Sequence, residues 1–594
     1  RTVAGLAARL ASSAATIAPA PARPAPAPDP RPGWAPMTVA QQQLWFLERM
    51  LPGQATAHVP LALRLRGEPD PAALARALDD IVARHPVLGS AVVTDDAGEP
   101  WLRPGPARVP LPVTEVPGGT AGQRAAHLAE LLRAAVRGPF DLAAGPLCRL
   151  TLVRPLSGTD ERPPVLLLVL HHVVCDFRSV AVLVRDLALL YRREAEGGAP
   201  ELPGLTKTFG DWAESQRRRL AGPEGEALGR WWRGELEPLP EPLALPADRP
   251  RPPRPAGRAD VLLRRLQSPT PGAVAALARE RGATPFVVLL AAFEGWLTRW
   301  TGRPEMVVGT PALNRQEPGT VELVGYFVNL LALPARPRGG QPFIELLAAA
   351  GRQVKGALAH QEYPFARLSE RLSPSVTETV PEGRPEPLVS VVFQLQQARP
   401  EGLAAFALGA PGAEVEVGGW RLESLALPEP RTPFDLVLRT GVVDGVLVAS
   451  CLYDRDLFDG TTIARALASF ETLLAAAVAS PATLLSDLPV LPAAARQQVV
   501  REWNDRPAGE RRLPLEAMVG GPCREAPERV AAVCGDEHLT YGELGRRAGR
   551  VAARLAAEGV APGSVVAVTV PPSVGWVVAV TGAQWAGCAY LPRD

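Results

Sequence analysis

The chain has 594 residues, and its 63 basic and 62 acidic side chains leave a formal net charge of +1. A chain of this length exceeds one hydrophobic core and indicates roughly three to five domains or lobes. The even charge gives no support to a nucleic acid or an anionic membrane as a partner. No apolar run reaches the roughly 18 residues of a membrane-spanning helix, and the N-terminus lacks the pattern of a signal peptide. We therefore expect a monomeric, cytoplasmic protein without nucleic-acid or membrane partners.

The first 36 residues have the composition of a chain end followed by a linker. Residues 1–10 place small apolar side chains on one helical face but are too few to form a core. Residues 11–36 are rich in alanine and proline. This composition predicts an extended, semi-rigid linker between modules.

After the linker the sequence becomes periodic. Thr38 is expected to cap a helix, and residues 59–65 alternate as a half-buried strand. The pair Asp70-Pro71 has the order of a helix cap and a first helical proline. We interpret His85, which follows this helix and precedes a proline, as a structural hydrogen-bonding residue.

The most informative segment is an apolar strand that leads into a helix, with two histidines between them. Residues 165–170 are consecutively apolar, which is typical of a strand buried on both faces. Apolar residues then recur at helical spacing over residues 180–191, with Ser179 as the expected cap. If the strand continues through His171 and His172, one side chain faces a cleft and the other the scaffold. Histidine can exchange a proton near neutral pH, although a histidine pair alone is more often structural than catalytic.

A second lobe is expected after a connector rich in proline and arginine at residues 239–257. Thr284-Pro285 predicts a further capped helix, and residues 306–308 predict a short strand. Trp231 and Trp232 are interpreted as core residues.

The six cysteines are scattered, without a CxxC pair or a histidine at zinc-binding spacing. We expect them to be reduced and mostly buried, and we expect no metal site. Cys175 lies beside the histidines, but no feature of the sequence stabilises a thiolate there, so a nucleophilic role is the less favoured interpretation.

The histidine segment reads HHVVCDF and resembles the HHxxxDG signature of the condensation domains of nonribosomal peptide synthetases, which are relatives of chloramphenicol acetyltransferase. Other motifs of this family follow in the expected order. The opening TVAQQQLWFL resembles SxAQxRLWFL, VGYFVN at residues 324–329 fits VGxFVN, and HQEYPF at residues 360–365 fits HQxxPF. With TPFDL and YDRDLF further on, the resemblance extends over residues 37–491.

The flanking segments resemble the neighbouring domains of such a synthetase. Residues 1–10 resemble the last helix of a peptidyl carrier domain, whereas LTYGELGRRAGR from residue 539 and WAGCAYLP from residue 585 resemble the first motifs of an adenylation domain. The ATP phosphate-binding loop of that domain is not in the chain, so we do not expect this fragment to use ATP or Mg²⁺. The expected order is carrier remnant, linker, N-terminal lobe, C-terminal lobe, linker and partial adenylation subdomain, at residues 1–10, 11–36, 37–205, 206–491, 492–512 and 513–594.

The resemblance implies an α/β (α+β) fold with two chloramphenicol-acetyltransferase-like lobes in a V-shaped pseudo-dimer. It implies a tunnel between them, which receives the 4'-phosphopantetheine arms of an upstream and a downstream peptidyl carrier domain from its two ends. An acyl or peptidyl thioester would react there with the amine of an aminoacyl thioester to give an amide. The adjoining adenylation domain is a further expected partner.

The resemblance also assigns the site. His172, the second histidine of the signature, is expected to be catalytic, either accepting the amine proton or holding the amine by a hydrogen bond. His171 and Asp176 are expected to be structural, and a buried carboxylate needs a cationic partner, for which Arg315 is the first candidate and Arg149 the second. The residues expected to line the tunnel or to lie near pantetheine are Phe177, Ser179, Gly325 and Asn329, with a structural amide an equal interpretation of Asn329.

Two positions depart from the family pattern. Phe177 replaces the usual glycine, so either the backbone there is ordinary or the pantetheine path is narrowed. A bulky residue at this place also leaves open a polyketide-like donor. Gly89 stands where an arginine is usual.

These departures leave room for a catalytically degenerate domain that docks carriers or tailoring enzymes. Among related enzymes, a heterocyclisation domain is excluded because it carries DxxxxD in place of the histidine pair. An epimerisation domain is disfavoured because such a domain closes a module, whereas the start of an adenylation domain follows here.

Overall fold

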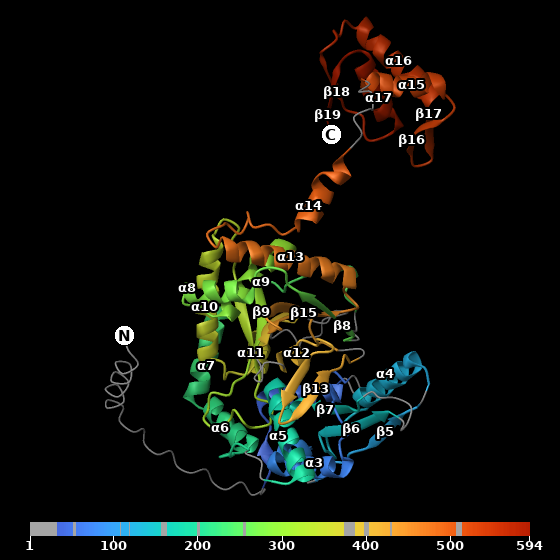
Figure 1. Ribbon diagram of the computed structural model, residues 1–594. Coiled ribbons are helices and arrows are strands. Elements are labelled where there is room, and N and C mark those ends of the chain that lie inside the picture. Colours follow the sequence, from blue (N-terminus) through green and yellow to red (C-terminus); the bar gives the residue numbers. More distant parts are fainter. Residues whose placement is uncertain are drawn as a thin grey trace. The chain divides into compact units, whose positions relative to one another are not determined.

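The computed structural model divides the chain into two compact units, residues 1–495 and residues 496–594. It describes residues 33–50, 55–106, 108–117, 119–155, 163–198, 202–252, 257–372, 387–396, 403–427, 431–505 and 514–593. The expected carrier remnant and most of the first linker lie outside these residues. The larger unit consists of two lobes, each built on a six-stranded mixed sheet (Figure 1).

The N-terminal lobe has a sheet in the order β12-β13-β2-β7-β6-β5. Its strands are β2 (His58–Leu65), β5 (Val113–Val116), β6 (Cys148–Pro155), β7 (Val165–His171), β12 (Glu414–Val417) and β13 (Trp420–Ser424). The helices α3 (Pro71–Arg84) and α5 (Phe177–Glu196) pack together over one face, and α4 (Ala121–Arg137) contacts the strands from the other.

Strand β7 is the centre of this lobe and is buried along its whole length. Because side chains alternate across a sheet, its residues divide between two cores. Leu166, Leu168 and Leu170 join the cluster under α3 and α5. The cluster on the other face takes Val165, Leu167 and Val169. The expectation of a strand buried on both faces is confirmed.

The C-terminal lobe has a sheet in the order β10-β9-β11-β14-β15-β8. The strands are β8 (Ala259–Arg265), β9 (Met306–Ala312), β10 (Asn329–Ala335), β11 (Val391–Gln396), β14 (Leu436–Val443) and β15 (Val446–Asp454). The helices are α8 (Pro271–Glu280), α9 (Pro285–Thr301), α10 (Phe343–Ala359), α11 (Phe365–Leu372), α12 (Leu403–Ala407) and α13 (Gly460–Ala479). Helix α9 lies between α10 and α13 and carries the largest share of buried apolar residues in the lobe core.

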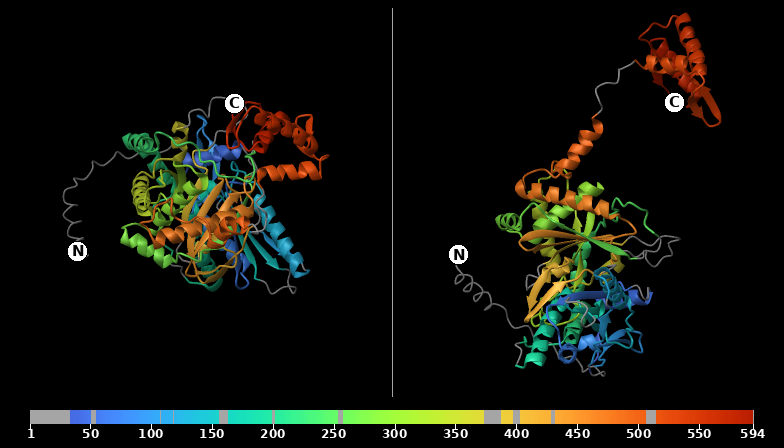
Figure 2. Two further views of the ribbon diagram at one scale, coloured as in Figure 1. Left: turned by 90° about the horizontal axis from the view of Figure 1, so that it is seen from above. Right: turned by 45° about the vertical axis from the view of Figure 1, so that its right-hand side comes forward.

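One hairpin crosses between the lobes. The strands β12 and β13 belong by sequence to the expected C-terminal lobe, yet β13 pairs antiparallel with β2 and extends the N-terminal sheet. Arg64 of β2 and Glu423 of β13 form an ion pair across this junction, with 2.9 Å between Nη1 and Oε1. Figures 1 and 2 show the hairpin beside the blue and cyan strands of the first lobe.

The remaining elements of this unit join the lobes or cover their ends. They are α2 (Val39–Met50), α6 (Phe209–Ala221), α7 (Pro223–Leu236), α14 (Ala493–Val500) and a small sheet in the order β1-β4-β3, formed by Ala35–Pro36, Pro100–Arg103 and Ala91–Thr94. The predicted caps Asp70 and Thr284, each followed by a proline, are confirmed. Thr38 also caps α2, because its Oγ1 accepts the Gln41 backbone N–H.

Helix α13 is long and apolar enough to cross a membrane by length and composition alone. Its buried side chains, including Phe470 and Leu474, belong to the core of the C-terminal lobe. An amphipathic core helix accounts for this pattern.

The second unit contains α15 (Leu515–Glu525), α16 (Tyr541–Ala557) and α17 (Val574–Trp585) around a small core. Two short sheets accompany them, one of β16 (Val530–Cys534) and β17 (Glu537–Thr540), the other of β18 (Val565–Val568) and β19 (Ala589–Pro592). Several apolar side chains of these strands are exposed, among them Val533, Val565 and Leu591.

Candidate functional site

The histidine pair lies where the central strand of the N-terminal lobe ends. His171 is the last residue of β7, and His172 begins a short 3₁₀ turn that runs to Val174. The strand therefore does not continue through both histidines, and the change of backbone direction separates their side chains. The turn is held in place because the His172 N–H donates to the Ala57 carbonyl, with 2.7 Å between the heavy atoms.

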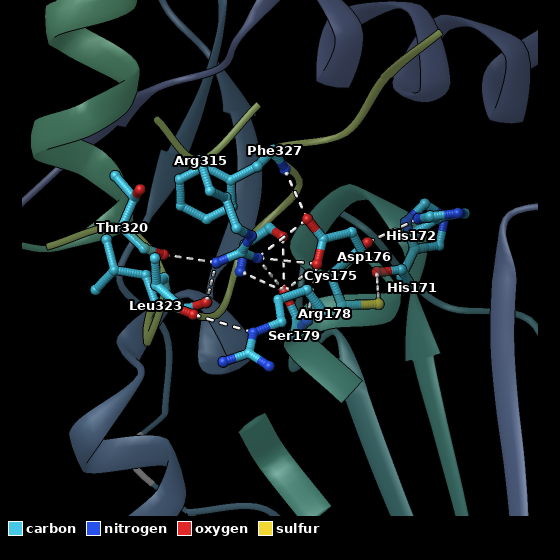
Figure 3. Close-up of polar contacts among 12 residues, drawn as sticks. His171, His172, Cys175, Asp176, Arg178, Ser179, Arg315, Thr320, Leu323 and Phe327 are labelled. Atoms are coloured by element: carbon cyan, nitrogen blue, oxygen red, sulfur yellow. Dashed lines mark hydrogen bonds and ion pairs between the residues drawn. The ribbon is translucent and has the colours of Figure 1, made fainter. Parts of the chain in front are cut away.

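Asp176 and Arg315 form a buried ion pair just beyond this turn. Arg315 Nη2 lies 2.9 Å from Asp176 Oδ1 and 3.0 Å from Oδ2, and both side chains are almost fully buried. Arg315 also donates to the carbonyls of Thr320 and Leu323 and lies over the Phe327 ring (Figure 3). Burial lowers the pKa of the guanidinium, and the adjacent carboxylate opposes that shift.

Arg149, the second candidate for this pairing, lies elsewhere. Its Nη2 donates to the Gly138 carbonyl, and its guanidinium lies 4.0 Å from the centre of the Phe140 ring.

Ser179 does not cap the following helix, contrary to the expectation. Helix α5 begins at Phe177, and its N-cap is Asp176, whose Oδ1 accepts the Ser179 N–H. A carboxylate that accepts N–H groups at a helix start satisfies donors that otherwise have no partner. The Ser179 hydroxyl lies within 2.9 Å of Asp176 Oδ1, the Gly325 carbonyl and Arg315 Nη2. Asp176 therefore serves two structural purposes at once.

The VGYFVN segment is fastened to this cluster through its backbone. The Gly325 N–H donates to Ser179 Oγ, and the Phe327 N–H donates to Asp176 Oδ2. Gly325 has no room for a side chain, since a Cβ there would lie 2.0 Å from Cδ2 of Phe209. The signature of the N-terminal lobe and a motif of the C-terminal lobe thus form one buried network.

Asn329 is a structural amide. Its Nδ2 donates to the carbonyls of Gln361 and Tyr363, and its Oδ1 accepts the Phe365 N–H. The VGYFVN and HQEYPF motifs are therefore joined by one side chain. Ser179, Gly325 and Asn329 are all buried in contacts within the protein, so we do not place them along a substrate passage.

The His172 imidazole is held in one tautomer. Its Nδ1 lies 2.7 Å from the Cys175 carbonyl, which can only accept, so Nδ1 carries the proton and Nε2 carries the lone pair. Burial lowers the pKa of His172, while the carbonyl contact and Asp176 oppose this shift. The ring is partly exposed and packs edge-on against Tyr326, with 5.0 Å between ring centres. A neutral imidazole with a free lone pair can accept a proton or a hydrogen bond.

His171 is structural. Its Nδ1 accepts the Val173 N–H, and its ring packs edge-on against Phe140 and His58. Burial, with smaller contributions from His58 and His172, lowers the pKa of His171 to about 3. It therefore stays neutral near pH 7, as its place in the scaffold requires.

Phe177 has ordinary backbone geometry. It is the first residue of α5, and it is not among the described residues with positive φ. The glycine usual at this place is therefore not needed for the local backbone. The side chain is 37% exposed, so it is the member of the expected pantetheine-proximal set that can meet a ligand.

Some supporting residues were missed by sequence reasoning. Gln41 is fully buried and donates from Nε2 to the Val173 carbonyl, so the opening motif supports the histidine turn. Arg178 and Arg185 of α5 both pair with Glu322 of the C-terminal lobe. The glutamine of the AQQQLWFL motif was a usable signal for the first, whereas nothing in the sequence identified the ion pairs.

Gly89 explains its own departure from the family pattern. A Cβ at this position would lie 2.6 Å from the Pro106 carbonyl oxygen, and one at Gly105 would lie 1.8 Å from the Gly89 carbonyl oxygen. The two backbones approach each other so closely that an arginine has no space. The nearby His85 is buried against Asp186, with 3.5 Å between Nε2 and Oδ2, which agrees with a structural role.

Two cavities stand out among the described residues. One, of about 350 Å³, is lined by Arg66, Glu414, Gly419 and Arg421, and the other is an apolar space inside the N-terminal lobe core. Neither adjoins His172, so the through-tunnel stays a prediction. The described residues contain no cluster of potential metal ligands. All six cysteines are free, and four of them are buried.

Comparison with known proteins places this architecture. Residues 32–500 match the family model of the condensation domain, and residues 522–594 match that of the AMP-binding enzyme. The chain belongs to the condensation domain family. Condensation domains of peptide synthetases catalyse amide bond formation, an acyltransferase-type reaction. The start of an AMP-binding domain follows the condensation domain here.

Curated relatives are nonribosomal peptide synthetases. Phosphinothricin tripeptide synthetase PhsB of Streptomyces viridochromogenes is 37% identical over 597 residues, which cover all of this chain and 48% of the relative. A linear gramicidin synthase of Brevibacillus parabrevis is 33% identical over 570 residues, which cover 94% of this chain and 11% of the relative. The chain thus spans about half or less of these relatives.

Solved structures agree on the fold. A four-domain nonribosomal peptide synthetase bound to AMP and glycine superposes with a TM-score of 0.75 at 21% identity, over 96% of this chain and 42% of that one. The X-domain from teicoplanin biosynthesis superposes with a TM-score of 0.65 at 26% identity, over 79% of this chain and 100% of its own. The expected fold of two acetyltransferase-like lobes with a partial adenylation region is confirmed.

Proposed function

We propose that this condensation domain joins an acyl or peptidyl thioester on an upstream carrier domain to the amine of an aminoacyl thioester on a downstream carrier domain. The 4'-phosphopantetheine arms of the carriers supply the acyl groups as activated thioesters. The observation that supports this proposal most is the fixed tautomer of His172, which leaves Nε2 as an acceptor on a partly exposed ring.

The proposed step needs one proton acceptor. The amine nitrogen attacks the thioester carbonyl carbon, and the proton that the nitrogen loses passes to His172 Nε2. The C–S bond breaks as the tetrahedral intermediate collapses, and the leaving thiolate takes up the proton. General-base assistance of this kind contributes about 10²- to 10⁴-fold, and orientation of the reactants contributes more. The lowered pKa of His172 keeps the ring neutral and able to accept at neutral pH.

The buried network supports this chemistry by position. Asp176 and Arg315 fix the start of α5 against the VGYFVN segment, while Gln41 and Ala57 hold the turn that carries His172. A catalytic group must be held within fractions of an ångström to be effective. We therefore assign these residues to positioning and His172 to catalysis, with Phe177 as the contact for pantetheine.

We also propose the domain boundaries that the sequence indicates, with lobes at residues 37–205 and 206–491, except that the β12–β13 hairpin completes the first sheet. Residues 513–594 are proposed to form no acyl-adenylate by themselves. The cytoplasmic location and the monomeric state remain part of the same proposal.

A second candidate function is recruitment of another enzyme by a catalytically degenerate domain. The likeness to the teicoplanin X-domain supports it, because a solved structure shows that domain in complex with OxyB. His172, with its free Nε2, argues for catalysis instead.

The experiment that separates the two candidates uses the full chain. Upstream and downstream carriers are loaded with acyl and aminoacyl groups, mixed with the chain, and measured by intact-protein mass spectrometry. Condensation predicts a new mass on the downstream carrier equal to the joined product. If the chain gives no product with any acyl or peptidyl donor, the proposed amide synthesis is rejected.

A further inference from the structure

Tyr326 is the residue of the VGYFVN segment that faces the histidine turn. Its ring lies edge-on against His172, with 5.0 Å between ring centres and 72° between ring planes. The family motif leaves this position open, so no role follows for it from the motif. The contact places a phenol beside the one imidazole to which we assign the proton.

The position of Tyr326 is fixed from both sides. The preceding Gly325 N–H is bonded to Ser179, and the following Phe327 N–H is bonded to Asp176. His172 is fixed in turn by its own contact with the Cys175 carbonyl. The phenol and the imidazole are therefore held relative to each other before any substrate binds, which is the condition for electrostatic preorganisation.

The Tyr326 hydroxyl is available to a ligand. The residue is partly exposed, and within the described part of the chain its hydroxyl has no hydrogen-bond partner. Burial of the ring, with smaller effects of Asp176 and Cys175, raises the pKa of Tyr326 well above its usual value. The phenol thus stays protonated near neutral pH and remains a donor.

The two side chains together match the needs of amide formation. His172 Nε2 offers one acceptor, which suits the N–H of the attacking amine. The thioester carbonyl oxygen becomes negatively charged as the tetrahedral intermediate forms, and it needs a donor. Within the described residues, no protein group competes for the Tyr326 hydroxyl.

We propose that Tyr326 is a catalytic residue, whose hydroxyl donates a hydrogen bond to the thioester carbonyl oxygen as that oxygen becomes an oxyanion. This inference rests on the proposed amide synthesis. No bond to Tyr326 is made or broken: its O–H hydrogen stays on the phenol, while the amine proton passes to His172. Collapse of the intermediate returns the oxygen to a carbonyl and ends the interaction.

The test compares Tyr326→Phe with a matched control, Tyr363→Phe, in the full chain. Both changes remove one hydroxyl, and the Tyr363 hydroxyl is buried without a partner among the described residues. The measurement is the single-turnover rate of amide formation at saturating carriers. We expect Tyr326→Phe to lose about 100-fold, the loss typical of one oxyanion donor, and Tyr363→Phe to keep the wild-type rate.

A second variant keeps the test decisive if Tyr326→Phe folds poorly. Site-specific 3,5-difluorotyrosine at position 326 retains the ring and the hydroxyl but has a more acidic phenol. We expect activity near neutral pH and a loss at high pH that begins at a lower pH than in wild type, because the ionised phenol can no longer donate. A residue that only packs against His172 would not move this limb.

The outcomes separate this inference from the function on which it rests. If wild type makes no amide, the proposed function fails. If wild type makes amide and Tyr326→Phe matches it, or if both phenylalanine variants lose activity equally, Tyr326 is not the donor, although the amide synthesis stands. An unshifted high-pH limb in the difluorotyrosine variant likewise overturns the inference.

Discussion

Arg315 Nη2 lies within 3.0 Å of both carboxylate oxygens of Asp176, and neither side chain has more than 4% of its surface exposed. The pair joins the start of α5 in the N-terminal lobe to the segment before VGYFVN in the C-terminal lobe. The position of His172 relative to that segment therefore depends on a buried ion pair.

Breaking this pair should destabilise the condensation domain strongly. Arg315→Ala leaves the Asp176 carboxylate buried and unpaired, so we expect the free energy of unfolding to fall by about 3 to 5 kcal/mol. Chemical denaturation of the condensation domain measures this change. The matched control is Arg303→Ala, which removes an exposed pair with Glu241 and should cost about 1 kcal/mol or less. Equal effects of the two changes would show that the buried pair has no special importance.

The rate of amide formation should depend on pH through His172. Burial lowers the pKa of this ring below its ordinary value of 6.5, and only the neutral ring accepts a proton. We therefore expect the single-turnover rate to fall as the pH decreases, with a midpoint below 6.5. The residual activity of His172→Gln reports the ionisation of the acceptor amine alone and serves as the control. A wild-type midpoint above 6.5 that His172→Gln does not share would contradict the assigned protonation state.

Part of this site was readable from the sequence, and the reason is local. The strand before His171 is apolar throughout because both its faces are buried, and Asp70 and Thr284 stand before prolines because helix starts favour that order. Asp176 and Arg315 were paired by a simple rule: a buried carboxylate needs a cation.

The remainder depended on contacts that no local pattern encodes. Ser179 has the chemistry of a cap, but Asp176 reaches the same N–H groups three residues earlier. The β12–β13 hairpin alternates like any edge strand, and nothing in its sequence tells which of two sheets it joins. Tyr326 stands at an open position of its motif, so its place beside His172 became visible only in three dimensions.

Glu294 should make stability fall as the pH rises. This residue of α9 is 1% exposed, its Oε1 has no partner among the described residues, and burial raises its pKa from 4.5 to about 8. The folded state thus holds a proton that the unfolded state has released. The stabilising effect is complete below pH 4.5 and is lost as the pH rises toward about 8.

Glu294→Gln should remove that dependence. We expect the thermal midpoint of the variant to exceed that of wild type at about pH 8 and the difference to shrink toward about pH 5. Glu345→Gln changes an exposed residue of α10 in the same lobe and should leave the pH dependence unchanged. If Glu294→Gln showed the same alkaline decline as wild type, the carboxyl would not be the group responsible.

Restoring the arginine usual in the family at position 89 should damage this protein. The Cβ of Gly89→Arg would lie 2.6 Å from the Pro106 carbonyl oxygen, so the backbone must move. We expect a loss of about 1 to 3 kcal/mol, as for other overpacked sites, and no gain in activity. Gly98→Ser, at a turn where a Cβ would meet nothing within 4 Å but φ is +82°, separates backbone strain from steric contact. A stable, more active Gly89→Arg variant would refute the close approach of the two backbones.

The most direct test of the central claim is the single-turnover rate of amide formation by His172→Ala with loaded upstream and downstream carriers. If the Nε2 lone pair of His172 accepts the amine proton, the rate should fall by about 10²- to 10⁴-fold, while the thermal midpoint stays close to that of wild type. A variant that formed the amide at the wild-type rate would contradict the role of His172.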